Sequence, residues 1–138
     1  MNTFKGIPTN PGSVNGISFT LRPFRDGDER SLQHHINDER VARDVSNIPY
    51  PYTMDHARQW IMFMQKEQQR ETPQRIDFAI DFNGEVIGSV AFIHVDVHKA
   101  QVSFWLGVDH WGKGIMTTAT KLLLAYGFEV LGIVRIYA

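Results

Sequence analysis

The sequence predicts an α+β fold, and three observations support that prediction. Two alternating apolar runs flank Asn83-Gly84, the dipeptide that most strongly signals a β-hairpin. Apolar residues recur at helical spacing in 57–64 and again in 119–130. The hydrophobic period therefore changes along a chain of 138 residues, which is the length of one domain.

Period-two alternation marks the predicted strands. Ile17, Phe19 and Leu21 alternate with polar residues until Pro23 ends the run. Before them, residues 1–16 are rich in Gly and Pro and predict a flexible leader, so the folded domain is predicted to span 17–138. The predicted strands are 17–22, 76–82, 85–95, 101–108 and 134–138.

Helix signals fall between these strands. Asp26 and Glu29 have capping-box spacing and predict a short helix that runs to about Asn37. The segment 38–52 is predicted to be irregular because prolines interrupt it. Thr53 is a good N-cap for a second helix, and a third helix ends before Gly132. The predicted order is β-α-α-β-β-β-α-β, ending in a right-handed parallel crossover.

Composition excludes several classes of function. Lys and Arg total 14 against 15 Asp and Glu, so the net charge of −1 predicts no nucleic-acid or membrane-surface partner. The absence of cysteine removes disulfides, thiolate metal sites and a cysteine nucleophile. The N-terminus lacks the pattern of a signal peptide and no apolar run has the length of a membrane span, which together predict a cytoplasmic protein.

The informative segment is a strand that leads through Gly112-Lys113-Gly114 into a helix. Glycines let the backbone approach a ligand closely, and the free N–H groups of a first helical turn favour phosphate. A tight turn without a ligand is an equally good interpretation of the glycines alone. The Rossmann pattern fails because Thr117 occupies its third glycine position, and the Walker pattern fails because Lys113 precedes the second glycine.

The segment Phe104–Ala119 resembles motif A of the GNAT acetyltransferases, and in particular their Rim-type ribosomal-protein branch. Two further stretches, Asn37–Ala42 and Ser46–Thr53, resemble the linker between the first two helices of that branch. Leu21–Phe24 resembles its opening strand. The resemblance covers Ile17–Ala138 in the right order, and it implies a central mixed sheet of the GNAT type.

This resemblance implies acetyl-CoA as co-substrate and a primary amine, either a protein N-terminus or a small molecule, as acceptor. Backbone groups of Leu106, Gly107 and Val108 would pair with the pantetheine arm, and a β-bulge there would open a wedge for the thioester. A backbone N–H in the wedge would stabilise the oxyanion. Transfer would be direct because no cysteine is present. The implied pyrophosphate site comprises Gly112, Lys113, Gly114, Ile115, Met116 and Thr117.

Other residues have two interpretations each. Tyr50, Tyr52 and Trp105 are predicted to line the acceptor groove, with core or loop packing as an even alternative. Ser103 could order a water beside the amine, although a serine satisfied by the sheet is the commoner case. His94, His98 and His110 lack metal-ligand spacing, so no metal site is predicted, and His110 is a weak candidate base. Asp77 and Asp81 are predicted to be solvated, and no catalytic residue is assigned.

The chain departs from the family pattern in three ways. Trp111 occupies the first position of the family signature, and Met116 stands where a small residue is expected. The resemblance also implies a further helix and two strands after the strand that ends at Ala138, so the predicted fold lacks its C-terminal segment. The alternative function is therefore a non-catalytic acyl-CoA-binding or assembly module. The exposed last strand predicts pairing with another chain, which would give a homodimer or an aggregate.

Overall fold

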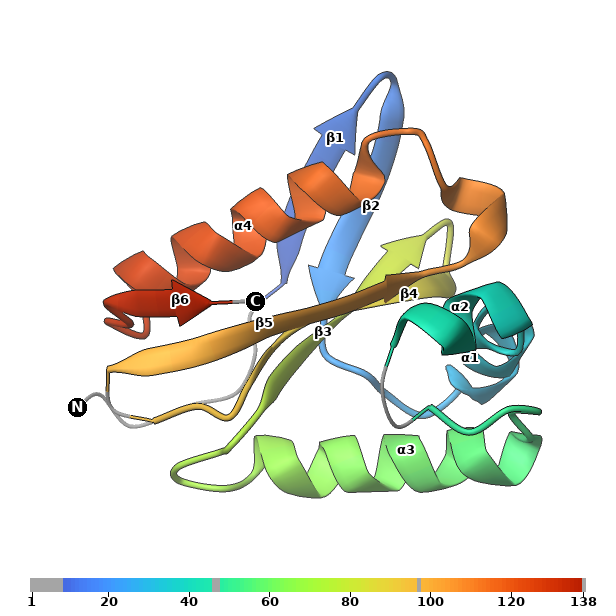
Figure 1. The fold of residues 1–138 in the computed structure, drawn as a ribbon, viewed down its shortest axis with the longest axis horizontal. Coiled ribbons are helices and arrows are strands. Elements are labelled where there is room, and N and C mark those ends of the chain that lie inside the picture. The colour runs from blue at the N-terminus through green and yellow to red at the C-terminus, as the bar shows by residue number, and fades with distance from the viewer. Residues whose placement is uncertain (1–8, 46–47, 97, 138) are drawn as a thin grey trace.

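In the computed structural model, which describes residues 9–45, 48–96 and 98–137, a six-stranded sheet has the order β1-β2-β3-β4-β5-β6 (Figure 1). Neighbouring strands are antiparallel except β5 and β6, which are parallel. This mixed sheet confirms the predicted α+β class. The strands are β1 (Asn10–Val14), β2 (Ile17–Arg22), β3 (Ile76–Phe82), β4 (Glu85–Ile93), β5 (Lys99–Leu106) and β6 (Arg135–Tyr137).

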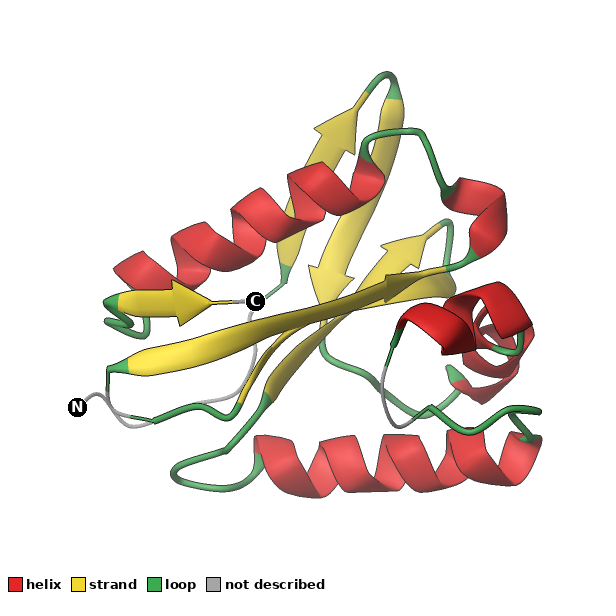
Figure 2. Ribbon diagram, in the orientation of Figure 1, coloured by secondary structure: helices red, strands yellow, loops and turns green. Residues whose placement is uncertain are grey.

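Helices cover both faces of the sheet (Figure 2). One face carries α1, α2 and α3, and the other carries α4. Within the described ranges, no helix is long and apolar enough to cross a bilayer. The helices are α1 (Glu29–Ile36), α2 (Glu39–Asp44), α3 (Met54–Gln68) and α4 (Ile115–Glu129), with a 3₁₀ turn, η1, at Val108–His110.

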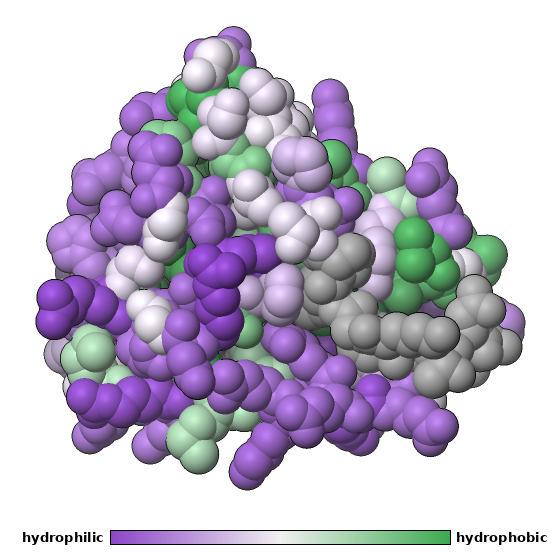
Figure 3. Space-filling view, turned by 180° about the vertical axis from the view of Figure 1, so that it is seen from behind, coloured by the Kyte–Doolittle hydropathy of each residue, from purple (hydrophilic) through white to green (hydrophobic). Residues whose placement is uncertain are grey.

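Each face of the sheet has its own apolar core. On the α4 side, Phe78 and Phe92 pack with Leu123, and all three side chains are fully buried. On the other side, Ile61 of α3 packs with Leu32 of α1. Because both faces are covered, the central strands are buried on both sides. The face of the molecule seen in Figure 3 is mainly hydrophilic, with apolar side chains scattered over it.

Two Asn-Gly turns shape the first half of the sheet. Asn83 and Gly84 have φ of 54° and 87° and join β3 to β4, as predicted. Asn15 and Gly16 have φ of 51° and 78° and join β1 to β2 in the same way. The prediction of a loop through residue 16 is therefore wrong for 10–14, which form an edge strand. Residues 1–8 of the predicted leader lie outside the described part of the chain.

Two helical predictions also need correction. The segment 38–52 contains α2, whose first turn is capped because the Asp38 side chain accepts the N–H of Arg40. Residues 46 and 47 of the linker match are not described. Helix α1 begins at Glu29 without a capping box, since Asp28 instead accepts hydrogen bonds from Arg22 and from the N–H of Arg25. The predicted capping of α3 by Thr53 is confirmed.

The strands β5 and β6 pair over only three residues. Lys99–Gln101 pairs with Arg135–Tyr137, and among the residues that the structure describes β5 continues beyond this pairing without a neighbour on that edge. Pairing of β4 with β5 is regular from Gln101 to Leu106, and the register shift of the sheet lies instead between Ile80 and Asp81. The predicted bulge near Leu106 is therefore wrong.

A glycine within α4 sets how closely that helix approaches the sheet. A Cβ atom on Gly127 would lie 2.5 Å from Cζ of Phe92, whose side chain is fully buried. Alanine usually stabilises a helix interior by about 1 kcal/mol relative to glycine. Here we expect Gly127→Ala to destabilise the fold by about 1 to 3 kcal/mol because of overpacking. Urea unfolding measures this, and adding Phe92→Leu should recover part of the loss. A variant more stable than the parent would contradict the packing.

Candidate functional site

The edge of β5 beyond Gln101, here called the open edge, presents backbone groups that no strand within 9–45, 48–96 and 98–137 uses. The N–H of Gly107 donates to the carbonyl of Ile87 at 2.7 Å, so odd-numbered residues of this strand bond to β4. The N–H and C=O groups of Val102, Phe104 and Leu106 therefore point to the other edge, where β6 ends its pairing at Gln101. An extended ligand can add to this edge as a strand would.

Some of the backbone groups predicted to pair with a pantetheine arm are already hydrogen-bonded within the protein. Gly107 has no free N–H for that role, and its carbonyl accepts the N–H of His110 at 2.9 Å. The carbonyl of Val108 likewise accepts the N–H of Trp111 at 3.1 Å. Leu106 does face the open edge, and its carbonyl accepts the indole Nε1–H of Trp111 at 2.7 Å. Phe104, which the sequence interpretation missed, contributes the next pair of open groups.

The first turn of α4 lies beside this edge. Gly114 precedes the helix with φ of 82°, a left-handed conformation that favours glycine. The first intrahelical bond is that of the Thr118 N–H to the Gly114 carbonyl at 3.1 Å. The N–H groups of 115–117 precede that bond and are free of partners within the helix. With the helix dipole, they favour an anion at this position.

The tip of the first hairpin supports the glycine loop. Asn15 Nδ2 donates to the carbonyl of Lys113 at 3.2 Å. A Cβ atom on Gly114 would lie 3.0 Å from Cγ2 of Val14. The sequence interpretation missed this contact because it placed both residues of the tip in the leader. The Asn-Gly dipeptide at 15–16 was the available signal.

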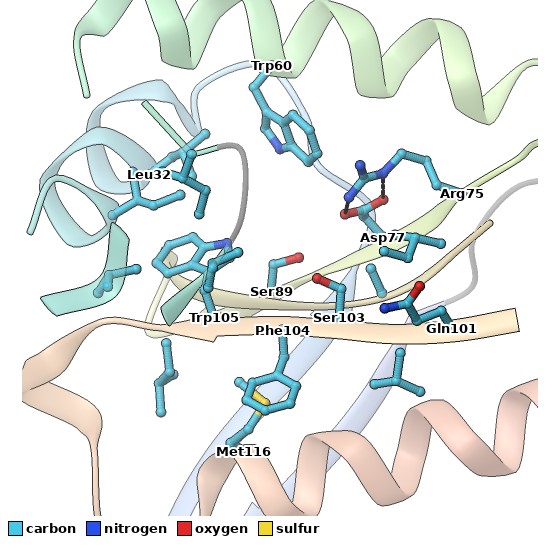
Figure 4. Close-up of a pocket in the computed structure, with 18 of the residues that line it drawn as sticks. Leu32, Trp60, Arg75, Asp77, Ser89, Gln101, Ser103, Phe104, Trp105 and Met116 are labelled. Carbon is cyan, nitrogen blue, oxygen red and sulfur yellow. Dashed lines mark hydrogen bonds and ion pairs between the residues drawn. The ribbon is translucent and has the colours of Figure 1, made fainter. Parts of the chain in front are cut away.

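Met116 lines the space beside the loop and also contacts the core. Its side chain is half-buried and packs against the α4-side core, and Figure 4 shows it beneath Phe104. The ring of Phe104 is 51% exposed on this side of β5. The departure from a small residue at 116 therefore places a larger side chain at the wall of this space, and the core accommodates part of it.

One groove of about 1590 Å³ joins the two faces of the sheet at the open edge. On the α4 side it is lined by Gly112, Gly114 and 115–117. On the other side it runs beneath α3, between Trp60 and the residues of β4 and β5 that face α3 (Figure 4). The groove can therefore hold two molecules that approach each other from opposite faces of β5.

The sequence matches the family description "Acetyltransferase (GNAT) domain" over residues 18–138. The chain belongs to the GNAT acetyltransferase family. The match covers most of the chain, including the strand, glycine loop and helix that form the α4 side of the groove. It confirms the resemblance inferred from motif A and from the upstream segments.

Several proteins of known name are similar to this GNAT domain in sequence or in fold. The uncharacterized N-acetyltransferase p20 of Bacillus licheniformis is 29% identical over 86% of this chain and 67% of its own length. The spermidine N(1)-acetyltransferase of Escherichia coli K12 is 27% identical over 87% of this chain and 62% of its own. RimJ of Mycobacterium smegmatis, solved with CoA-disulfide, has a TM-score of 0.83 at 19% identity and shares the fold. RimJ is aligned over 99% of this chain and 68% of its own, so the GNAT domain spans 62% to 68% of the length of these proteins.

Two of the three residues predicted to line the acceptor groove do line it in the structure. Tyr52 is 6% exposed in the core beneath α3, and burial raises the pKa of its hydroxyl to about 12. Trp105 is 9% exposed and lines the groove from the same face of the sheet. Tyr50 is 53% exposed and does not line the groove. Tyr52 also lines the groove, so Tyr52 and Trp105 are the two of the three whose positions suit contact with an acceptor.

Histidines gather where α1 meets the end of β5. The ring of His35 lies 4.8 Å from that of His34 and 5.5 Å from that of His110, measured between centroids. Burial lowers the pKa of both His35 and His110, and neighbouring positive charges lower it further. His110 lines the groove, while Nε2 of His35 is buried without a hydrogen-bond partner. Among the described residues, no three His, Asp or Glu side chains form a group suited to a metal.

The lowered pKa of His35 predicts acid sensitivity. In the unfolded chain its pKa returns to its ordinary value of 6.5, so the unfolded state binds more protons below that pH. Stability contributed by the neutral ring is therefore lost as pH falls below 6.5. We expect His35→Gln to lose less stability than the parent between about pH 7 and about pH 5 in urea unfolding. Exposed His98→Gln is the control, and equal slopes for all three proteins would refute the assignment.

Proposed function

We propose that this GNAT domain transfers an acetyl group from acetyl-CoA directly to a primary amine. The observation that supports the proposal most strongly is the single groove that crosses the open edge of β5. Cofactor would bind on the α4 side, and the amine would enter from the α3 side. The two reactants would then meet beside Leu106 without a covalent enzyme intermediate.

The chain offers suitable groups for each part of acetyl-CoA. The free N–H groups of 115–117 would hold the pyrophosphate, together with the backbone of Gly112, Lys113 and Gly114. A Cβ atom on Gly112 would meet nothing within 4 Å, which leaves open space above this loop. The backbone groups of Phe104 and Leu106 would pair with the pantetheine arm. Trp111 would release the Leu106 carbonyl as the arm binds.

The chemistry requires a neutral amine and a stabilised oxyanion. The amine nitrogen bonds to the acetyl carbonyl carbon, the carbon–sulfur bond breaks, and the departing thiolate takes up the proton that the amine loses. His110 is our candidate to receive that proton first, because it lines the groove and its lowered pKa keeps the ring neutral near pH 7. N–H groups of the open edge would face the developing oxyanion.

Release of CoA measured with a thiol reagent across a panel of amines tests the proposal. We expect release above the enzyme-free rate with at least one amine, and calorimetry should show binding of acetyl-CoA. Absence of binding at about millimolar cofactor would overturn the proposal. Binding without release for any amine would favour the alternative of a non-catalytic acyl-CoA-binding module.

A further inference from the structure

The α3 side of the groove has a polar floor. Asp77 pairs with Ala91, and Ala91 pairs with Ser103, so Asp77 and Ser103 share one face of the sheet. Ser89 lies on the same face, two residues from Ala91. The small side chain of Ala91 leaves space between Asp77 and Ser103. Figure 4 shows the side chains of Asp77, Ser89 and Ser103 on the side of the sheet where Trp60 lies.

The carboxylates of Asp77 and Glu67, which line this part of the groove, are already matched by arginines. Oδ1 and Oδ2 of Asp77 accept Nε–H and Nη2–H of Arg75 at 2.7 and 2.8 Å. Oε1 of Glu67 accepts a hydrogen bond from Arg70 at 3.0 Å. The prediction that Asp77 is solvated is wrong, because α3 covers this face and leaves it 2% exposed. Burial raises the pKa of Asp77, and the paired guanidinium opposes that effect.

Arg75 is the charged group that an incoming molecule meets. Its side chain is 29% exposed, against 2% for that of Asp77 beneath it. The guanidinium carbon lies 4.9 Å from the centre of the Trp60 ring, which fixes the group above the floor. Neither hydrogen bond to Asp77 uses Nη1, so this nitrogen can donate to a ligand. The ion pair has no net charge, and its outer surface is a hydrogen-bond donor.

The pair lies at a defined distance from the end of β5. Ser103 precedes Leu106 by three residues, which is roughly 10 Å along a strand. Asp77 lies level with Ser103, two strands away, and the guanidinium of Arg75 is bonded to its carboxylate. An acceptor whose amine is at the end of β5 therefore reaches Arg75 only if it is long. A second ammonium group at that distance would meet a guanidinium, and like charges repel.

We propose that Arg75 is a specificity-determining residue of the acceptor groove, a role that rests on the proposed function. By neutralising Asp77 and presenting Nη1, it selects an uncharged hydrogen-bonding chain, such as a peptide whose first residues are uncharged. It excludes long polycationic amines. Short monoamines, which end before the ion pair, are unaffected by it.

Relative kcat/KM values for three acceptors test the role: a short monoamine, an uncharged peptide with a free N-terminus, and spermidine. We expect Arg75→Gln to lower the value for the peptide about tenfold and to raise that for spermidine about tenfold. The value for the monoamine should change less than about twofold. Adding Asp77→Asn to Arg75→Gln should abolish the gain for spermidine. Arg58→Gln, an exposed change on the same side of the molecule, should leave all three values unchanged.

Asp77→Asn alone provides a second variant if loss of Arg75 prevents folding. It leaves Arg75 uncompensated, so spermidine should become a poorer acceptor and a peptide with an acidic residue a better one. Calorimetry of spermidine and peptide in the presence of CoA gives the same comparison without turnover. No turnover with any amine would count against the proposed function alone. Unchanged acceptor ratios in turnover or binding for both variants would overturn the role of Arg75.

Discussion

Arg22→Ala is expected to lower the free energy of unfolding by about 3 to 5 kcal/mol, because it removes the buried guanidinium that pairs with the carboxylates of Asp28 and Asp81. Arg22 is 4% exposed and holds Asp28 through two hydrogen bonds of 2.8 and 2.9 Å. Its Nε–H also donates to Asp81 at 2.6 Å. These contacts join β2, the start of α1 and β3, so the loss extends across three elements.

Urea unfolding at neutral pH measures this loss. Arg40→Ala is the matched control, since Arg40 pairs with Asp38 while its side chain is 55% exposed. Exposed pairs contribute about 0 to 1 kcal/mol. A loss for Arg22→Ala no larger than that for Arg40→Ala would show that the buried network is not a source of stability.

The second large effect concerns the glycine loop. In Gly114→Val, a β-branched residue must adopt φ of 82°, and its Cβ lies 3.0 Å from Cγ2 of Val14. The strain of about 1 to 2 kcal/mol shifts the first turn of α4. We expect the affinity for acetyl-CoA, measured by calorimetry, to fall at least about tenfold.

Gly132→Val is a control that introduces similar backbone strain away from the proposed phosphate site. Gly132 has φ of 69°, a Cβ atom on it would meet nothing within 4 Å, and it follows the other end of α4. The variant should lose stability to a similar degree and keep its affinity for acetyl-CoA. If both variants lost affinity equally, the first turn of α4 would not be the phosphate site.

The central hairpin could be predicted because every local signal agrees there. Alternation in 76–82, the Asn83-Gly84 turn and the apolar run from Glu85 all favour one structure. The first hairpin has the same turn at Asn15-Gly16, but Pro11 and Gly12 give its edge strand low strand propensity. Pairing with β2 supplies what the local sequence lacks.

Short elements and charged groups were harder to predict. Helix α2 has six residues and one buried apolar side chain, Val41, which is too little for a periodic pattern. Because side chains alternate along β3, Asp77 faces the side of the sheet opposite to Phe78, and the sequence therefore predicted it to be solvated. It is buried because α3 covers the second face of the sheet, and no local pattern reports that contact.

Part of the functional site could likewise be predicted from the sequence, and part could not. The glycine loop could be predicted because a strand, two glycines and a helix follow each other in the sequence. The backbone groups of β5 that face away from β4 could not, because they depend on the register of these two strands. The Asn15 contact to the loop and the Arg75–Asp77 pair depend on residues brought together by the sheet and its helices.

Backbone amide NMR during titration with CoA shows whether the cofactor binds along β5 and at the start of α4. We expect the largest shift changes at the amides of Phe104 and Leu106, at those of 115–117, and at the indole N–H of Trp111. Saturating CoA that perturbs only amides outside the open edge of β5 and the first turn of α4 would contradict this expectation.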